Sequence, residues 1–237
     1  MEALLQFGGF PEPFQSQSKE IYRAWASNRL ELLVRQDLRE ISNIMNIGQV
    51  ELLASFIPDR VGSPLSVQSL AEDLDAAHTT VTRWMKDLSD VYYHFEIKPH
   101  SKSIPRALKK EGKVYLYDWS TVENDGPRFE NMVASHLLKA IDFYNDTGQG
   151  NLRLRYLRDK EKNEVDFVIL EKEKPLYTVE AKRGDLSLAK GFQAFRRYID
   201  VPHFQIVKQP GIFRRFEIPK QTNAYVISFD SFFEYLP

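Results

Sequence analysis

Between residues 126 and 229, one long amphipathic helix, three strand-like segments, a second helix and further strands follow one another. This order most constrains the fold. The long helix is expected to begin near Gly126-Pro127, because proline fits a first helical turn, and to end by Gly148. Apolar residues that alternate with polar ones, or that run together, predict the β-strands. The predicted strands are 152–158, 164–170, 176–182, 203–207 and 224–229, with the second helix at about 186–199. The order αβββαβ(β) predicts an α/β (α+β) fold in which helices cover the faces of a sheet.

Charged residues interrupt two of these apolar strands. Glu180 and Lys182 are two positions apart in one strand, so both side chains project from the same face of the sheet. Asp166 lies in the preceding strand and can lie beside Glu180 if the two strands pair as a hairpin. Two carboxylates on adjacent strands offer the oxygen ligands that Mg²⁺ or Mn²⁺ prefers, and a nearby ammonium could polarise a phosphate. Because buried charges are paired or coordinated, the three residues predict either a metal site or a structural ion pair at a strand edge.

The beginning of the chain is predicted to be helical after a short loop. Residues 1–14 contain Gly8-Gly9 and two spaced prolines, which favour a loop. Residues 16–44 predict a helix in which a break is allowed, and a short helix is expected at about 49–57. No internal repeat or low-complexity segment occurs.

A helix-turn-helix pattern follows. Two helices are expected at 66–74 and about 77–88, joined by a short turn, which is typical of this DNA-binding motif. The basic segment 98–113 and the alternating strand 113–118 come next. A helix-turn-helix with a basic β-hairpin predicts a winged helix.

The formal net charge of −1 hides an uneven distribution. Residues 1–97 hold 8 Lys and Arg against 14 Asp and Glu, whereas residues 98–237 hold 24 against 19. A basic second part favours an anionic partner, and we expect DNA. The candidate contacts are Arg83, Lys86, Lys98, Lys102, Arg106, Lys109 and Lys110. Acidic residues in the first helix of the motif argue against groove binding, so an alternative is that this module packs against a partner protein.

Several classes of protein are excluded by what the sequence lacks. The chain has no cysteine, so it has no disulfide framework, zinc ribbon or thiol nucleophile. No apolar run reaches the length of a membrane span, and the first residues lack the pattern of a secretion signal, so we expect a cytoplasmic protein. No G-x-x-x-x-G-K-[ST] motif occurs, so we expect neither ATP binding nor ATP hydrolysis through a P-loop.

The residues around the charged strands carry a resemblance to known families. Glu130 on the long helix, Asp166, and Glu180-Ala181-Lys182 resemble the PD-(D/E)XK nuclease superfamily. The runs Phe129-Glu130-Asn131, Tyr156-Leu157-Arg158, Glu164-Val165-Asp166-Phe167 and Val179-Glu180-Ala181-Lys182 more closely resemble the DUF4143 domain. That domain follows an AAA-type ATPase in many bacterial and archaeal proteins. Gly8-Gly9-Phe10-Pro11-Glu12 is similar to the segment near the end of the ATPase module.

The resemblance implies a restriction-endonuclease-like mixed sheet flanked by helices, and it implies roles for individual residues. Asp166 and Glu180 would be metal ligands, Lys182 the catalytic lysine, and Glu130 a helix carboxylate that supports the metal or its waters. Gln193 on the next helix matches only loosely, and Val165 stands where the proline of the superfamily name would be. From the residues alone, Glu130 is equally compatible with a solvated position in a first helical turn.

These patterns predict three parts and a DNA-associated function. Residues 1–47 would be a helical remnant of the ATPase side, 48–124 the winged helix, and 125–237 the nuclease-like domain. The chain would be the C-terminal part of an AAA-type ATPase without its P-loop. It would hydrolyse phosphodiesters with Mg²⁺ or Mn²⁺. The alternatives are a non-catalytic module that docks onto DNA or an ATPase, and a winged-helix transcriptional regulator.

Overall fold

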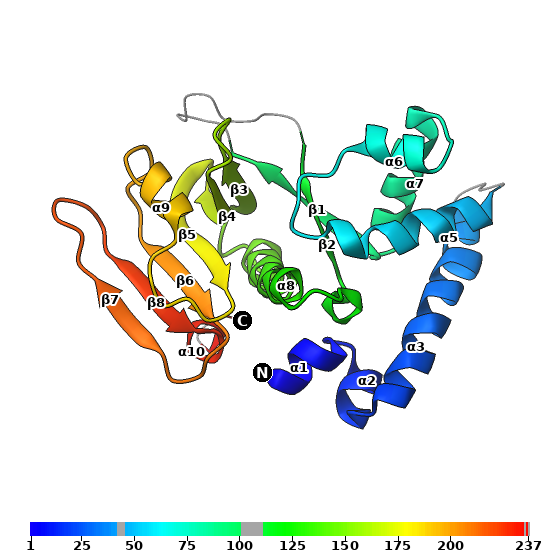
Figure 1. Cartoon of the computed structure of the whole chain (residues 1–237), viewed down its shortest axis with the longest axis horizontal. Helices are drawn as coiled ribbons and strands as arrows, with labels where there is room; N and C mark the ends of the chain where they lie inside the picture. Colours follow the sequence, from blue (N-terminus) through cyan, green and yellow to red (C-terminus); the bar gives the residue numbers. More distant parts are fainter. Residues whose placement is uncertain (42–45, 101–110, 235, 237) are drawn as a thin grey trace. The chain divides into compact units, whose positions relative to one another are not determined.

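The computed structural model describes residues 1–41, 46–100, 111–234 and 236, and the chain divides into two compact units (Figure 1). The first unit comprises Met1–Glu96 and Lys113–Asn124, and the second comprises Ile97–Gly112 and Asp125–Pro237. Within the described residues, none of the helices combines the length and the apolar character needed to cross a membrane.

The first unit is mainly helical. Its elements are α1 (Glu2–Phe7), α2 (Pro11–Ser16), α3 (Lys19–Leu32), α4 (Leu38–Ile41), α5 (Ile47–Phe56), α6 (Val67–Asp73), α7 (His78–Asp90), the start of β1 (His94–Pro99) and β2 (Lys113–Leu116). A π-helical segment, Leu33–Asp37, joins α3 to α4, so the chain is helical without a break from Lys19 to Ile41.

The loop predicted for residues 1–14 is wrong, because α1 and most of α2 lie there. Pro11 is the first residue of α2, where its missing N–H costs no helical hydrogen bond, and Gly8 at a φ of 77° ends α1. The indole Nε1 of Trp119 donates a 2.9 Å hydrogen bond to the Leu4 carbonyl and fixes α1. A contact so distant in sequence leaves no local pattern.

The two helices of the predicted helix-turn-helix are present as α6 and α7. The Ser66 hydroxyl caps α6 by accepting a hydrogen bond from the Ser69 amide at 3.3 Å. Val81, Trp84 and Leu88 form the buried stripe of α7. Residues 101–110 of the expected wing lie outside the described residues, so the winged helix stays a prediction.

The second unit is a mixed sheet with helices on both faces. Its strands are the end of β1, β3 (Leu152–Arg158), β4 (Glu164–Glu171), β5 (Lys174–Lys182), β6 (His203–Val207), β7 (Phe213–Phe216) and β8 (Ala224–Ser228), in the spatial order β1-β3-β4-β5-β6-β8-β7. β3, β4 and β5 pair antiparallel, whereas β5, β6 and β8 pair parallel. The helices are α8 (Asp125–Asp146), α9 (Lys190–Phe195) and α10 (Phe229–Phe233). The predicted α+β class is therefore confirmed.

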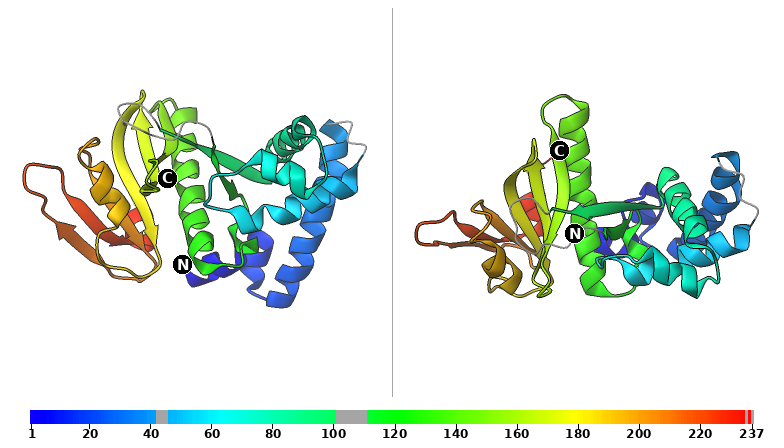
Figure 2. Two further views of the ribbon diagram at one scale, coloured as in Figure 1. Left: turned by 45° about the horizontal axis from the view of Figure 1, so that its top comes forward. Right: turned by 90° about the horizontal axis from the view of Figure 1, so that it is seen from above.

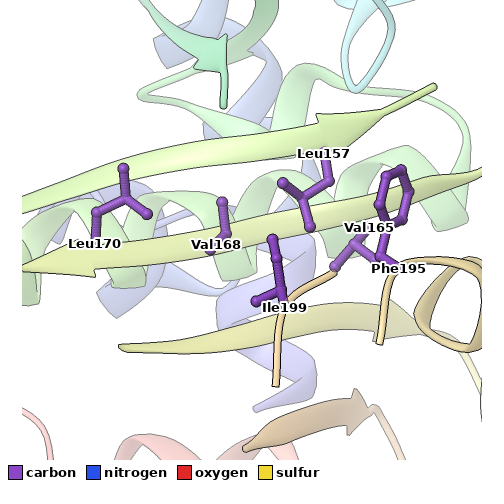
Figure 3. Close-up of a cluster of buried hydrophobic side chains, with 6 residues drawn as sticks. All are labelled: Leu157, Val165, Val168, Leu170, Phe195 and Ile199. Atoms are coloured by element: carbon purple, nitrogen blue, oxygen red, sulfur yellow. The ribbon is translucent and has the colours of Figure 1, made fainter. Parts of the chain in front are cut away.

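Helices α8 and α9 cover opposite faces of the antiparallel strands (Figure 2). Beneath α9, six buried side chains form the core shown in Figure 3: Leu157, Val165, Val168, Leu170, Phe195 and Ile199. Glycine at position 191 allows this close packing, because a Cβ there would overlap the Glu164 carbonyl oxygen.

The second predicted helix, 186–199, is shorter in the structure, because α9 begins only at Lys190. Residues 183–189 instead form a loop between β5 and α9. Strand β7 was not predicted, since its four residues, Phe-Arg-Arg-Phe, are too few to show a period.

Candidate functional site

Strands β4 and β5 form the antiparallel hairpin that brings Asp166 beside Glu180. Phe167 pairs with Val179 in the register, so Asp166 and Glu180 are the next residues along the two strands, and the two carboxylates interact electrostatically. Glu180 is two residues from Thr178, the partner of Val168, so it is on the face that α9 covers, where Val168 packs in the core with Phe195. The adjacency predicted from the sequence is therefore present.

Both carboxylates are buried. Asp166 is 6% exposed, and its Oδ2 accepts a hydrogen bond from the Ala181 amide at 3.0 Å. Glu180 is 4% exposed, and its Oε1 lies 2.7 Å from Lys182 Nζ. Glu180 Oε2 is buried and has no hydrogen-bond partner among the described residues. One carboxylate oxygen at the centre of the site thus lacks the partner that a buried polar atom normally has.

The charges of the site strongly perturb Glu180. Burial and the neighbouring Asp166 raise the pKa of Glu180 to about 8, although Lys182 opposes the rise. Glu130 on α8 also contributes to it, so this helix carboxylate lies within electrostatic range of the pair. Burial lowers the pKa of Lys182, but Glu180 and Asp166 outweigh this effect and the pKa is raised overall, which keeps the ammonium charged. All four residues predicted for the site therefore interact electrostatically.

The donor set fits a divalent ion held by few protein ligands. Among the described residues, no group of three or more His, Cys, Asp and Glu side chains is arranged to hold a metal ion. Mg²⁺, however, is commonly held by one or two carboxylates and keeps several waters. Asp166 and Glu180 are two such carboxylates, and Glu180 Oε2 is an oxygen without a partner.

Gln205 organises the loop that follows Lys182, and sequence reasoning missed it. Gln205 on β6 is fully buried and lies beside Glu180 in the parallel register. Its Oε1 accepts a hydrogen bond from the Ala189 amide at 2.9 Å. Its Nε2 donates to the carbonyls of Asp185 and Ser187 at 2.6 and 2.8 Å. Gln205 therefore holds residues 183–189 next to the acidic site. Its partners are backbone atoms, so no motif could reveal it.

His203 is a second buried polar residue near the site. Its Nδ1 lies 2.9 Å from the Thr178 hydroxyl, and its ring stacks on Phe192 of α9 with 4.1 Å between the ring centroids. Burial, helped by the charge of Lys182, lowers the pKa of His203 to about 3, so the ring is neutral at physiological pH. Its contacts indicate that it anchors α9 against the sheet.

Gln193, which matches the nuclease superfamily only loosely, is exposed on α9. Arg183, directly after Lys182, forms a 2.7 Å ion pair with Asp125 in the first turn of α8. Both side chains are substantially exposed, so this pair adds little stability.

The structure describes only some of the residues that were predicted to contact DNA. Lys102, Arg106, Lys109 and Lys110 lie outside the described residues. Arg83 is exposed on α7. Lys86, also on α7, pairs with Asp90 one turn later, so its charge is already compensated.

Lys98 is exposed on β1 in the second unit and lies opposite Arg155 of β3 in a parallel register. Arg155 itself pairs with Val168, which pairs with Thr178, so Arg155 is on the face of Glu180. Like charges directly opposite each other on paired strands repel, and a bound anion would relieve this repulsion. Burial, with the charge of nearby Arg153, lowers the pKa of Arg155.

Curated relatives of this chain exist, and it spans about a quarter to half of their length. It is 22% identical over 209 residues to "Uncharacterized protein MJ1544" of Methanocaldococcus jannaschii, covering 84% of this chain and 46% of that protein. It is 24% identical over 111 residues to "Uncharacterized protein Rv2008c" of Mycobacterium tuberculosis, covering 47% of this chain and 25% of that protein. No solved structure matches the chain.

Two family models match consecutive parts of the chain. The DUF4143 model, described as a domain of unknown function, covers residues 125–228 and includes Glu130, Asp166, Glu180 and Lys182. The DUF8612 model, also described as a domain of unknown function, covers residues 1–123, more than half of the chain. The protein thus belongs to the DUF8612 family and carries a DUF4143 domain after that region.

Proposed function

We propose that the second unit hydrolyses phosphodiester bonds in DNA, using Mg²⁺ or Mn²⁺ at Asp166 and Glu180. The observation that carries this proposal is the buried Glu180 carboxylate, whose Oε2 lacks a hydrogen-bond partner among the described residues and which lies beside a second buried acid. When Glu180 is ionised, two neighbouring buried acids with a single nearby ammonium leave an excess of negative charge. A divalent cation would compensate it.

The residues have separate roles in this proposal. Asp166 and Glu180 would hold the ion, and Glu130 would add negative charge from α8 or hold the waters around the ion. When bound, such an ion acts as a Lewis acid on a phosphoryl oxygen. Lys182, charged because of its acidic neighbours, would stabilise the negative charge that develops on the phosphate.

The basic residues beside the site support a polyanionic substrate. Lys98 and Arg155 lie opposite each other on β1 and β3, and Arg155 shares a face with Glu180. Arg153, two residues earlier on β3, is on the same face, but its charge is already compensated by a 2.6 Å ion pair with Glu173. Phosphates of a nucleic-acid backbone would neutralise Lys98 and Arg155.

Cleavage assays test the proposal directly. Single-stranded, duplex and branched DNA would be incubated with the chain and with Mg²⁺, Mn²⁺ or EDTA, and with the variants Glu180→Gln and Lys182→Met. Glu171→Gln, an exposed change at the end of β4 with the same loss of charge, is the matched control. We expect metal-dependent cleavage that both site variants lose and the control keeps. If wild type and the site variants behave alike on every substrate, the nuclease proposal is lost.

A second candidate function is a non-catalytic module that docks onto DNA or onto an ATPase. The observation that favours it is the 2.7 Å ion pair between Lys182 Nζ and Glu180 Oε1, by which the ammonium already compensates one carboxylate. The first unit, as a predicted winged helix of an AAA-type ATPase family, would supply the docking surface. This function predicts no thermal stabilisation by Mg²⁺, whereas the nuclease function predicts stabilisation that Glu180→Gln removes.

A further inference from the structure

Strand β7 lies at the outer edge of the sheet in the second unit (Figure 1). It pairs antiparallel with β8 on one side, and no strand of the described chain pairs with its other side. Its first three residues, Phe213, Arg214 and Arg215, are exposed. An edge strand of this kind is a template for pairing with another extended chain.

The open edge presents backbone donors and acceptors at alternate residues. The Ser228 amide donates a 2.9 Å hydrogen bond to the Ile212 carbonyl, so these two residues form a hydrogen-bonded pair of the antiparallel ladder. Such pairs alternate with pairs that exchange no hydrogen bonds. Arg214 therefore bonds to β8, whereas Phe213 and Arg215 direct their N–H and C=O groups away from it. An added antiparallel strand can exchange hydrogen bonds with both.

Contacts at both ends hold β7 in place. Before the strand, the Ile212 amide donates to the Ser228 hydroxyl at 2.6 Å, and that hydroxyl donates to the Gln209 carbonyl at 2.7 Å. After the strand, the Asp200 carboxylate accepts hydrogen bonds from the amide and the hydroxyl of Thr222 at 2.8 and 2.9 Å. The edge is therefore formed in advance, which lowers the entropic cost that a partner must overcome on binding.

The side chains of β7 determine the chemistry of a partner. Phe213 is 67% exposed, and its ring centroid lies 6.1 Å from that of Tyr225 on β8, so the ring offers an apolar surface beside the open edge. Arg214 and Arg215 offer two positive charges. Arg215 lies 3.5 Å from Glu217, but both side chains are exposed, so this ion pair is weak.

The positive charge around β7 disfavours a second copy of the chain as the partner. Residues 208–220 hold four Lys and Arg against one acid. Two β7 strands paired antiparallel about their centres would place Arg214 of one copy opposite Arg215 of the other. Like charges directly opposite each other destabilise a sheet, whereas opposite charges stabilise it. The edge therefore favours a segment with acidic residues at these two positions.

We propose that β7 binds an extended acidic protein segment, which adds to the sheet as an antiparallel strand. The segment carries two acidic residues opposite Arg214 and Arg215, and apolar residues opposite Phe213 and Phe216. Backbone hydrogen bonds supply the affinity, and the side chains select the partner. A nucleic acid would neutralise the arginines, but it would leave the row of backbone groups without partners. The proposal is independent of the nuclease proposal, since none of these residues belongs to the acidic site.

Titration of the full chain with three capped synthetic peptides tests the proposal. The first has the sequence Thr-Val-Ile-Glu-Glu-Val-Thr-Val, and the others carry Gln-Gln or Lys-Lys in place of Glu-Glu. In fluorescence anisotropy, we expect the Glu-Glu peptide to bind at least about fivefold more tightly than the Gln-Gln peptide, and the Lys-Lys peptide to bind most weakly. In amide NMR spectra, the signals of Phe213 and Arg215 should shift and gain protection from hydrogen exchange. The Arg214 amide, which bonds to β8, should change little.

Two variants and a control separate the charges from the backbone. Arg214→Glu reverses an exposed charge and should remove the preference for the Glu-Glu peptide. Phe213→Pro removes an N–H group that points away from β8, so the sheet keeps its ladder while all three peptides bind more weakly. Arg23→Glu makes the same charge change at an exposed position of α3 and should leave the affinities unchanged.

Three results would overturn the proposal. The first is equal affinity for the three peptides, or binding of none of them. The second is that a short oligothymidylate shifts the amide signals of β7 while the peptides do not, which would assign the surface to a nucleic acid. The third is a monomer–dimer equilibrium in analytical ultracentrifugation that Phe213→Pro abolishes, which would assign the edge to a second copy of the chain.

Discussion

Removing the side chain of Gln205 should release the loop beside the acidic site. In Gln205→Ala, the Ala189 amide loses its acceptor, and the carbonyls of Asp185 and Ser187 lose their donor. Three backbone groups that the glutamine satisfied would then depend on water. The loop between β5 and α9 should therefore become the first part of the second unit to open.

The size of the effect follows from the three hydrogen bonds. A hydrogen bond contributes about 0.5–1.5 kcal/mol net, and an orphaned buried group costs more. Because Gln205 is fully buried, its removal also leaves unfilled volume. We expect Gln205→Ala to lower the free energy of unfolding by about 2–4 kcal/mol.

Two measurements separate the local effect from the global one. Urea unfolding gives the change in stability, and residue-resolved amide hydrogen exchange gives the opening of the loop. Relative to wild type, the exchange rate of the Ala189 amide should rise at least about tenfold more than the rates of amides in the centre of β4. Gln193→Ala, which removes an exposed glutamine from α9, is the matched control and should change neither quantity.

One outcome would refute this reasoning. If Gln205→Ala destabilises the protein but Ala189 keeps its protection relative to the amides of β4, the glutamine fills space and does not hold the loop. A loss of stability equal to that of Gln193→Ala would be equally damaging to the argument.

Three further predictions follow from single contacts. In Mg²⁺-free buffer, wild type should lose stability relative to Glu180→Gln as the pH rises from about 4.5 to about 8, by a few kcal/mol, because the raised pKa of Glu180 favours its protonated form in the fold. Equal differences at pH 5 and pH 8.5 in urea unfolding would contradict this. Gly191→Ala should lower the free energy of unfolding by about 1–3 kcal/mol or more, because the added Cβ would overlap the Glu164 carbonyl. In the same assay Gly126→Ala should be nearly neutral, because a Cβ there meets no atom within 4 Å. Ser18→Ala should cost about 0.5–1 kcal/mol in thermal unfolding, because the Ser18 hydroxyl caps α3 through the Ile21 amide.

Local periodicity predicted those strands whose own residues carry an apolar pattern from end to end. β3 and β6 begin and end at the predicted residues, because alternating or continuous apolar residues span their whole length. Elements set by contacts distant in sequence were not predictable. The indole of Trp119 holds α1, and Gln205 ends the helix pattern early by keeping residues 183–189 as a loop.

The candidate site shows the same division. The hairpin and the two-residue period of a strand were enough to place Asp166, Glu180 and Lys182 together. The orphaned Oε2 of Glu180 and the three hydrogen bonds of Gln205 depend on how the tertiary structure encloses these side chains. Burial is a property of the packed fold, so the residue pattern alone left the metal site and the ion pair as equal interpretations.

The ion pair and a metal ion are not exclusive at Glu180, because they concern different oxygens. Lys182 contacts Oε1, whereas Oε2 is the atom without a partner. Removing the ammonium in Lys182→Met has two opposing effects on Mg²⁺ affinity. It removes a repulsive charge, which strengthens binding, but it raises the pKa of Glu180 further, so that protons compete with the ion.

The balance between these effects depends on pH in a direction that can be measured. Well above pH 8, at a pH where Glu180 is ionised in both proteins, Lys182→Met should bind Mg²⁺ more tightly than wild type in calorimetric titrations. Toward pH 6 the advantage should shrink or reverse, because protonation then costs the variant more. If the ratio of the two affinities does not change with pH, Glu180 is not a ligand, and the buried pair is structural.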